Sequence, residues 1–200
     1  MKAIDLSERF SEHFVLSEFL RSATAEAYQI PNIPLKCHIE RLRNLTVRCL
    51  EPTRQRFNLP LRVTSGYRCP LLNKLVGGVP NSQHMEGFAA DIQVPRQHWP
   101  FSITSEQQMA RVLFAWMRDS LPDYDQLIIE HHGQTWWVHV SCHIDLTKNR
   151  REALEIEKFF RSGWYSQLTS VDGEYLIRRL QEEVRQSESI RGKKNKSDRR

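Results

Sequence analysis

The strongest constraint on the fold is the stretch DQLIIEHHGQTWWVHVSC at residues 125–142. Two runs rich in β-branched and aromatic residues flank Gly133-Gln134, a pattern typical of a β-hairpin with a short turn. His139 lies in the middle of the second run between apolar neighbours, where an imidazole needs a polar partner. The stretch therefore predicts an antiparallel strand pair with a histidine that requires a functional or structural explanation.

Weaker signals predict the elements that precede this hairpin. Apolar spacing indicates a helix within residues 14–28, capped by Ser17 or Ser22, and a second helix over 35–57 that kinks or restarts at Pro52. The segments LRVTSGY (61–67) and DIQV (91–94) are typical of strands. The glycine-containing text between them, residues 69–90, predicts a long loop, and a loop of that length in a compact domain is usually functional.

Helices are also expected in the second half of the chain. Thr104 and Gln107 resemble a capping box at a helix start. The residues spaced for its core stripe are Met109, Val112, Leu113, Trp116 and Met117. Further helices are predicted over 149–160 and 173–186. Because helices and strands do not alternate regularly, the sequence indicates an α+β fold with a small antiparallel sheet flanked by helices.

Basic residues are concentrated at the C-terminus. The formal net charge is +5, and residues 185–200 hold seven Lys or Arg and two Asp or Glu, which leaves 22 residues of each sign in the remainder. A neutral body with a basic tail is typical of a solvated, disordered segment. Nucleic acid is therefore not the expected partner.

Composition excludes several other classes of protein. No run approaches eighteen apolar residues, so no membrane span is predicted. The N-terminus lacks the apolar segment and cleavage site of a secretory signal, and we expect the chain to be cytoplasmic as synthesised. Four scattered cysteines without a CxxC pair indicate small buried hydrophobes rather than disulfides or metal ligands. We also expect a monomer.

His84, Asp91 and His139 are the candidate metal ligands. Asp91 opens an apolar strand, and a buried carboxylate is costly unless a cation or donor pairs with it. Two histidines and one carboxylate are a donor set that Zn²⁺ prefers, and three protein ligands leave the fourth position open for water. Either histidine alone would more simply be a core residue with a hydrogen bond, so the combination carries the prediction.

The stretch SGYRCPLLNKLVGGVPNSQHMEGFAADI, followed by DQLIIE and WWVHVS, resembles the zinc D-Ala-D-Ala carboxypeptidase family, which shares its fold with the Hedgehog signalling domain. The likeness covers roughly residues 10–155 and is greatest to a phage and bacterial branch of peptidoglycan peptidases. It implies a Hedgehog/DD-peptidase-like zinc peptidase domain, which we place at 1–155. A helical extension (156–186) and a disordered basic tail (187–200) are expected to follow.

The resemblance assigns roles to particular residues. The family motif S-x-H-x-x-G-x-A-x-D coincides with residues 82–91 and the motif W-x-H-V with residues 137–140. It thus implies one Zn²⁺ per chain, held by His84, Asp91 and His139. The S-G-Y-R motif coincides with residues 65–68, which implies that Arg68 binds a substrate carboxylate or carbonyl. A guanidinium suits this role because it can donate two parallel hydrogen bonds to a carboxylate.

The general base departs from the pattern of the best-known members. They carry an acid three residues before the last histidine ligand, where this chain has Trp136. The resemblance supports Glu130 instead, because this branch often carries a glutamate there. A two-residue hairpin turn would place Glu130 on the face of His139, whereas one extra loop residue would present His131. We take Glu130 as the base, with His131 or His132 as alternatives.

These expectations describe a zinc metallopeptidase that hydrolyses peptidoglycan stem peptides with metal-activated water. Whether it acts as a carboxypeptidase or as an endopeptidase stays open at this point. Because no export signal is present, release to the cell wall as a phage-type lysis enzyme would explain how it meets its substrate. The alternative is a non-catalytic zinc-binding module for structure or partner binding.

Overall fold

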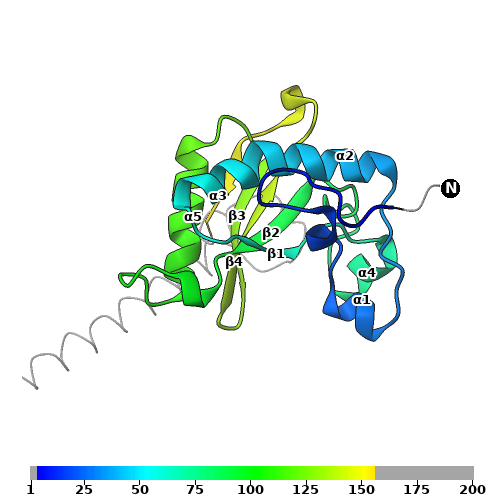
Figure 1. The fold of residues 1–200 in the computed structure, drawn as a ribbon, viewed down its shortest axis with the longest axis horizontal. Helices are drawn as coiled ribbons and strands as arrows, with labels where there is room; N and C mark the ends of the chain where they lie inside the picture. Colours follow the sequence, from blue (N-terminus) through cyan, green and yellow to red (C-terminus); the bar gives the residue numbers. More distant parts are fainter. Residues whose placement is uncertain (1–3, 156–200) are drawn as a thin grey trace, which may run out of the picture. The chain divides into compact units, whose positions relative to one another are not determined.

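The computed structural model describes residues 4–155, and Figure 1 shows them as helices around a central sheet, which confirms the α+β class. The first elements are the 3-10 turn η1 (Leu16–Phe19), α1 (Ala23–Ala27), α2 (Lys36–Leu45), the π-helical turn η2 (Thr46–Leu50) and α3 (Glu51–Phe57). Then follow β1 (Arg62–Ser65), α4 (Pro70–Leu75), β2 (Ala89–Gln93) and η3 (Arg96–His98). The last are α5 (Glu106–Ser120), β3 (Gln126–His132), β4 (Thr135–Ser141), η4 (Leu146–Lys148) and β5 (Glu152–Leu154).

The sheet has five strands in the order β1-β2-β4-β3-β5. The pairs β1–β2, β2–β4 and β3–β4 are antiparallel. At the β5 edge, the amides of Arg151 and Glu152 donate to the carbonyls of Tyr124 and Asp125. In these two hydrogen bonds the residue numbers rise together, from 151 to 152 on one segment and from 124 to 125 on the other. The strand β5 therefore runs parallel to β3. The sheet is therefore mixed, whereas a wholly antiparallel sheet was predicted.

The β3–β4 hairpin has the two-residue turn that fixes its register. His132 pairs with Thr135, which leaves Gly133 and Gln134 as the turn. Gly133 has a φ of 59°, the left-handed conformation that such a turn requires and that glycine adopts without strain. Glu130 consequently pairs with Trp137, as a two-residue turn predicts.

The two faces of the sheet have different environments. Alternate residues of β2, β3 and β4, namely Ala90, Ile92, Leu127, Ile129, Val138 and Val140, are buried in one hydrophobic cluster with residues of α2, η2 and α5. Figure 1 shows α2, α3 and α5 beside the sheet and α1 and α4 close together. The other face carries Asp91, Glu130, Trp137 and His139, because strand side chains alternate. The packed face thus supports a polar face.

The helix predicted over 35–57 is three consecutive segments. Pro52 lies in the first turn of α3 and cannot donate a backbone hydrogen bond, and the wider turn η2 precedes it. The restart expected at Pro52 therefore occurs as a π-helical turn. In the N-terminal segment, Ser22 caps α1 by accepting a hydrogen bond from the amide of Ala25. Of the two predicted caps, Ser17 and Ser22, the structure has Ser22 at the start of this helix.

Three details of the predicted elements differ from the structure. Ser105, not Thr104, caps α5, and it accepts from the amide of Gln108, so the cap lies one residue later than predicted. Val112 of the proposed core stripe is exposed, while Met109, Leu113 and Met117 are buried. The predicted loop 69–90 contains the short helix α4.

The end of the described chain also differs from the prediction. Residues 152–154 form the strand β5 where a helix over 149–160 was expected, because their backbone pairs with the segment that begins β3. The predicted helix over 173–186, the extension 156–186 and the tail 187–200 lie outside the described residues. Among the described residues, no helix is long and apolar enough to cross a membrane.

Candidate metal centre

His84, Asp91 and His139 converge on the polar face of the sheet. Asp91 on β2 and His139 on β4 are direct partners in the strand ladder. His84 reaches the same point from the turn that precedes β2. The residues are 2%, 8% and 8% exposed, so three ionisable or polar side chains meet in a nearly dry site. An arrangement of this kind requires a shared partner.

The facing atoms lie almost in contact. His139 Nδ1 is 2.9 Å from Asp91 Oδ1, His84 Nε2 is 3.2 Å from His139 Nδ1, and His84 Nε2 is 3.3 Å from Asp91 Oδ1. The other nitrogen of His84, Nδ1, is 2.7 Å from the carbonyl oxygen of Gly66. A carbonyl can only accept, so Nδ1 carries the hydrogen, and the Nε2 of a neutral His84 presents a lone pair to the other two atoms.

The three distances fit a tetrahedral zinc site. Zinc bonds nitrogen and carboxylate oxygen at about 2.0–2.1 Å, which places two ligand atoms of a tetrahedron about 3.3–3.4 Å apart. Without a metal, a hydrogen on His139 Nδ1 bonds to Asp91 Oδ1 at 2.9 Å; a bound cation would replace that hydrogen and leave three ligand atoms facing it. The contact from His84 to Gly66 fixes the ring orientation, as outer partners of metal ligands do. His84, Asp91 and His139 therefore form a candidate zinc site.

The charges in this cluster agree with cation binding. Burial raises the pKa of Asp91, but His84 and His139 outweigh it and hold that pKa well below its ordinary value. Burial lowers the pKa of His84, which favours the neutral ring that ligates metal. Burial also acts to lower the pKa of His139, but Asp91 reverses the direction and raises it. Asp91 supplies the negative charge of the site.

Glu130 lies beside this centre on β3. It pairs with Trp137, and Trp137 is two residues before His139, so all three side chains share a face. Trp137 Nε1 donates to Glu130 Oε2 at 2.8 Å, which orients the carboxylate. Burial raises the pKa of Glu130 above its ordinary value, although His139 and Trp137 act in the opposite direction.

The two alternative bases are placed less favourably. His131 stacks on Trp136 with ring centroids 4.4 Å apart, and both belong to the opposite strand face from Glu130. His132 is exposed next to the hairpin turn.

Arg68 follows β1 and lies close to the same centre. Its backbone amide donates to the carbonyl of His84 at 3.2 Å. Burial lowers the pKa of its guanidinium, while the charges of Asp91 and Glu130 raise it. Its Nε is buried and has no hydrogen-bond partner among the described residues. A guanidinium in this state is available to an anionic or carbonyl group of a ligand.

Gly66 brings the segment of Arg68 close to η1. A Cβ built on Gly66 would lie 2.5 Å from the carbonyl oxygen of Phe19 and 2.7 Å from its Cα. Both are backbone atoms, so no side chain fits there without displacing the segment that holds His84 Nδ1.

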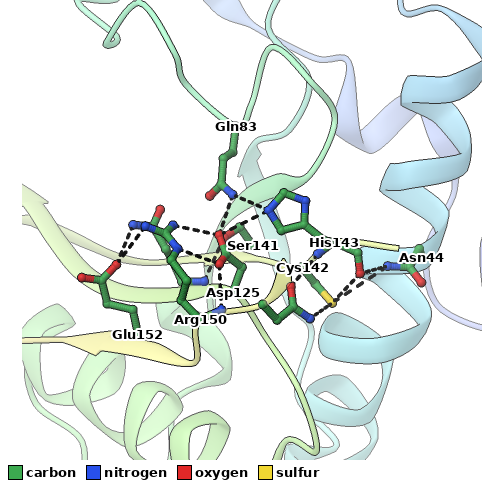
Figure 2. Close-up of polar contacts among 10 residues, drawn as sticks. Asn44, Gln83, Asp125, Ser141, Cys142, His143, Arg150 and Glu152 are labelled. Atoms are coloured by element: carbon green, nitrogen blue, oxygen red, sulfur yellow. Dashed lines mark hydrogen bonds and ion pairs between the residues drawn. The ribbon is translucent and has the colours of Figure 1, made fainter. Parts of the chain in front are cut away.

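A polar network around Asp125 was not anticipated from the sequence. Figure 2 shows its carboxylate among Gln83, Arg150 and His143. The carboxylate is fully buried and accepts from Arg150 Nε at 2.9 Å, Arg150 Nη2 at 2.9 Å and Gln83 Nε2 at 2.7 Å. Burial raises the pKa of Asp125, but the bonds from Arg150 and Gln83 outweigh it and lower that pKa.

This network adjoins the metal centre through the chain. Gln83 directly precedes His84, so its bond to Asp125 connects the ligand-bearing turn to the start of β3. The Asp125 amide also donates to the carbonyl of Ser141, two residues after His139. A sequence signal was present, because Asp125 directly precedes the apolar run of β3, where a buried carboxylate needs partners.

A second cluster of potential ligands exists among the described residues, formed by Glu12, His13 and Glu51. Glu12 and His13 are exposed, and the Glu51 carboxylate already accepts from Ser11 and contacts His13. These contacts explain the cluster without an ion.

Comparison with known proteins agrees with this geometry. Residues 11–119, more than half of the chain, match the model of a family described as Peptidase M15, whose members are zinc-dependent, D-Ala-D-Ala carboxypeptidase-like hydrolases. No curated protein matches the chain. The matched range contains His84 and Asp91, and His139 lies beyond it but pairs with Asp91 in the sheet. The chain therefore belongs to the peptidase M15 family.

Proposed function

We propose that this protein is a zinc metallopeptidase that hydrolyses peptidoglycan stem peptides. The observation that carries the proposal is the convergence of His84 Nε2, Asp91 Oδ1 and His139 Nδ1 within 3.3 Å, with a carboxylate on the same sheet face. Three ligands leave a fourth position for water, which distinguishes a catalytic zinc site from a closed structural one. The peptidoglycan substrate rests on the family resemblance.

The roles of the residues follow from their positions. His84, Asp91 and His139 would hold Zn²⁺, which supplies a water of pKa about 7 and polarises a carbonyl. Trp137 orients the carboxylate of Glu130, which would serve as the general base that takes up a proton and delivers it to the amine of the departing product. Burial raises the pKa of Glu130 above its ordinary value, which makes its carboxylate a stronger base.

Arg68 binds the substrate rather than the water. Its guanidinium is held near Asp91 and Glu130 without a direct ion pair among the described residues. It can therefore donate hydrogen bonds to a carboxylate or carbonyl of the peptide and hold it in register with the metal centre.

The decisive experiment incubates the purified protein with a mixture of muropeptides, with and without a chelator, and identifies the products by mass spectrometry. We expect zinc-dependent cleavage of a stem peptide. Glu130→Gln should bind zinc as the wild type does and lose about 10²–10⁴-fold in kcat, the usual contribution of a general base. A wild type that holds zinc and cleaves no stem peptide would refute the peptidase proposal.

The second candidate is a zinc-binding module without catalysis. Trp136 occupies the position at which the best-known relatives carry their acid, which favours this alternative. It predicts that wild type and Glu130→Gln bind zinc equally and that neither hydrolyses any muropeptide. Release as a phage-type lysis enzyme belongs to the peptidase proposal and would be tested by adding the protein to intact and to permeabilised bacteria.

A further inference from the structure

A pocket of about 320 Å³ lies directly beside the metal centre, with Asp91 in its wall. The rest of its lining comes from residues 21–24, residues 64, 65, 67 and 68, Leu72 of α4 and Val76 directly after that helix. Apart from Asp91, its charged residues are Arg21 and Arg68, and hydroxyl groups of serine and threonine lie around them. Asp91 is neutralised when a cation is bound, so the pocket then presents positive charge and hydrogen-bond donors.

The two arginines belong to segments that are tied to each other. Asn32 Nδ2 donates to the carbonyl of Leu20 at 3.2 Å and to the carbonyl of Tyr67 at 2.8 Å, and its Oδ1 accepts from the amide of Cys69 at 2.8 Å. These three backbone groups are the immediate neighbours of Arg21 and Arg68 in the chain. One half-buried side chain therefore ties together the two backbone segments whose arginines line the pocket.

Further contacts hold the same two segments together. The Tyr67 amide donates to the carbonyl of Phe19 at 2.8 Å, and Gly66 leaves no room for a side chain against Phe19. Ser22 caps α1 directly after Arg21. The backbones that carry the arginines are thus fixed, as a preformed binding site requires.

Neither arginine has an acidic partner at ion-pair distance among the described residues. Arg68 is half-buried and its Nε is buried without a hydrogen-bond partner among the described residues, which is costly for a cation. Arg21 is exposed, lines the pocket and forms no ion pair with another residue of the described range. A bound carboxylate would give both arginines a direct ion-pair partner.

We propose that Arg21 is a specificity-determining residue that completes a carboxylate subsite with Arg68. The subsite binds the free carboxylate of the residue on the C-terminal side of the scissile bond. Its volume lies at the small end of the range for ligand pockets, about 300–1,000 Å³, which suits a single terminal residue. The inference rests on the proposed function and deepens it, because it favours release of a C-terminal residue over cleavage within a chain.

Binding tests the subsite without turnover. Zinc-loaded Glu130→Gln is titrated calorimetrically with a stem pentapeptide that ends in a free carboxylate and with the same peptide as its C-terminal amide. We expect the carboxylate form to bind about tenfold more tightly, and Arg21→Gln in the same background to remove that preference without changing the affinity for the amide. Arg21→Lys should retain most of the preference, and Arg21→Glu should bind the carboxylate peptide more weakly than Arg21→Gln.

Arg56→Gln is the matched control, because Arg56 is exposed on α3 and does not line the pocket. An unchanged preference in Arg21→Gln, an equal loss for both peptides, or no binding of either peptide would overturn the subsite. Hydrolysis of the carboxylate peptide by the protein with Glu130 intact tests the proposed function separately. Turnover with an Arg21-independent preference rejects only the subsite, and Arg21-dependent binding without turnover rejects only the peptidase.

Discussion

At the scale of single residues, the hydrogen bond from Trp137 to Glu130 should control the pH dependence of hydrolysis. The indole donates to Oε2 at 2.8 Å and favours the ionised carboxylate, so its removal in Trp137→Phe raises the pKa of Glu130 further. A base with a higher pKa becomes protonated at higher pH. The acid limb of kcat/KM should therefore move to higher pH, with a loss of up to about tenfold on that limb.

Trp136→Phe provides the control for this experiment. Trp136 is the adjacent tryptophan, but it stacks on His131 and points to the opposite face of β4. The pH profile of kcat/KM for Trp136→Phe should match that of the wild type. Identical profiles for both variants and the wild type would show that Trp137 does not act on the base.

At the scale of elements, the Gln83–Asp125 bond should position the turn that carries His84. Gln83→Met removes this bond and leaves both contacts of Arg150 to Asp125 in place. Partners that orient a metal ligand typically contribute 10–100-fold to affinity, so we expect zinc binding to weaken by about tenfold. Competition with a chromogenic chelator measures this affinity, and the melting temperature without metal should change little.

Gln93→Met is a matched control for Gln83→Met. Gln93 is half-buried, as Gln83 is. Its side-chain amide donates to the backbone carbonyl of Trp136 at 2.8 Å. The substitution Gln93→Met should lower the stability of the fold without a specific effect on the affinity for zinc. Equal zinc affinities in the two variants would show that the Asp125 network serves the fold alone.

At the scale of the whole molecule, zinc should stabilise the fold. A ligand that binds only the native state stabilises it by about 4 kcal/mol at a thousandfold excess over its Kd. For a domain of this size that corresponds to a rise in Tm on the order of 10 °C. Differential scanning calorimetry with zinc and with a chelator measures the difference.

The zinc-dependent rise in Tm should also depend on pH and on the ligands. It should shrink below about pH 6, because His84 and His139 must lose their protons to bind metal. His139→Ala should show no such rise at any pH. A rise of equal size in this variant would mean that the metal binds elsewhere.

The sequence was most informative where the physical constraint is local. Alternation in the two runs around Gly133-Gln134 predicted the hairpin, and a two-residue turn was sufficient to predict that Glu130 opposes Trp137. The cap of α5 was predicted one residue early, since Thr104 and Ser105 are both good caps and propensity does not distinguish them. Residues 152–154 were predicted as helix because the partner that makes them a strand lies outside their own sequence.

The sequence by itself determined the residue types of the candidate metal centre, the hairpin and the likeness to a zinc peptidase, while it left the hairpin register conditional on the length of the turn. Tertiary structure decided which segments meet: the β2–β4 pairing that joins Asp91 to His139, the burial of Asp125, and the Asn32 bridge that places Arg21 beside Arg68. The physical reason is the distance along the chain over which each constraint acts. Turn geometry and side-chain alternation act between neighbours in the chain, whereas a ligand site or a substrate pocket requires groups that only the packed sheet and its loops bring together.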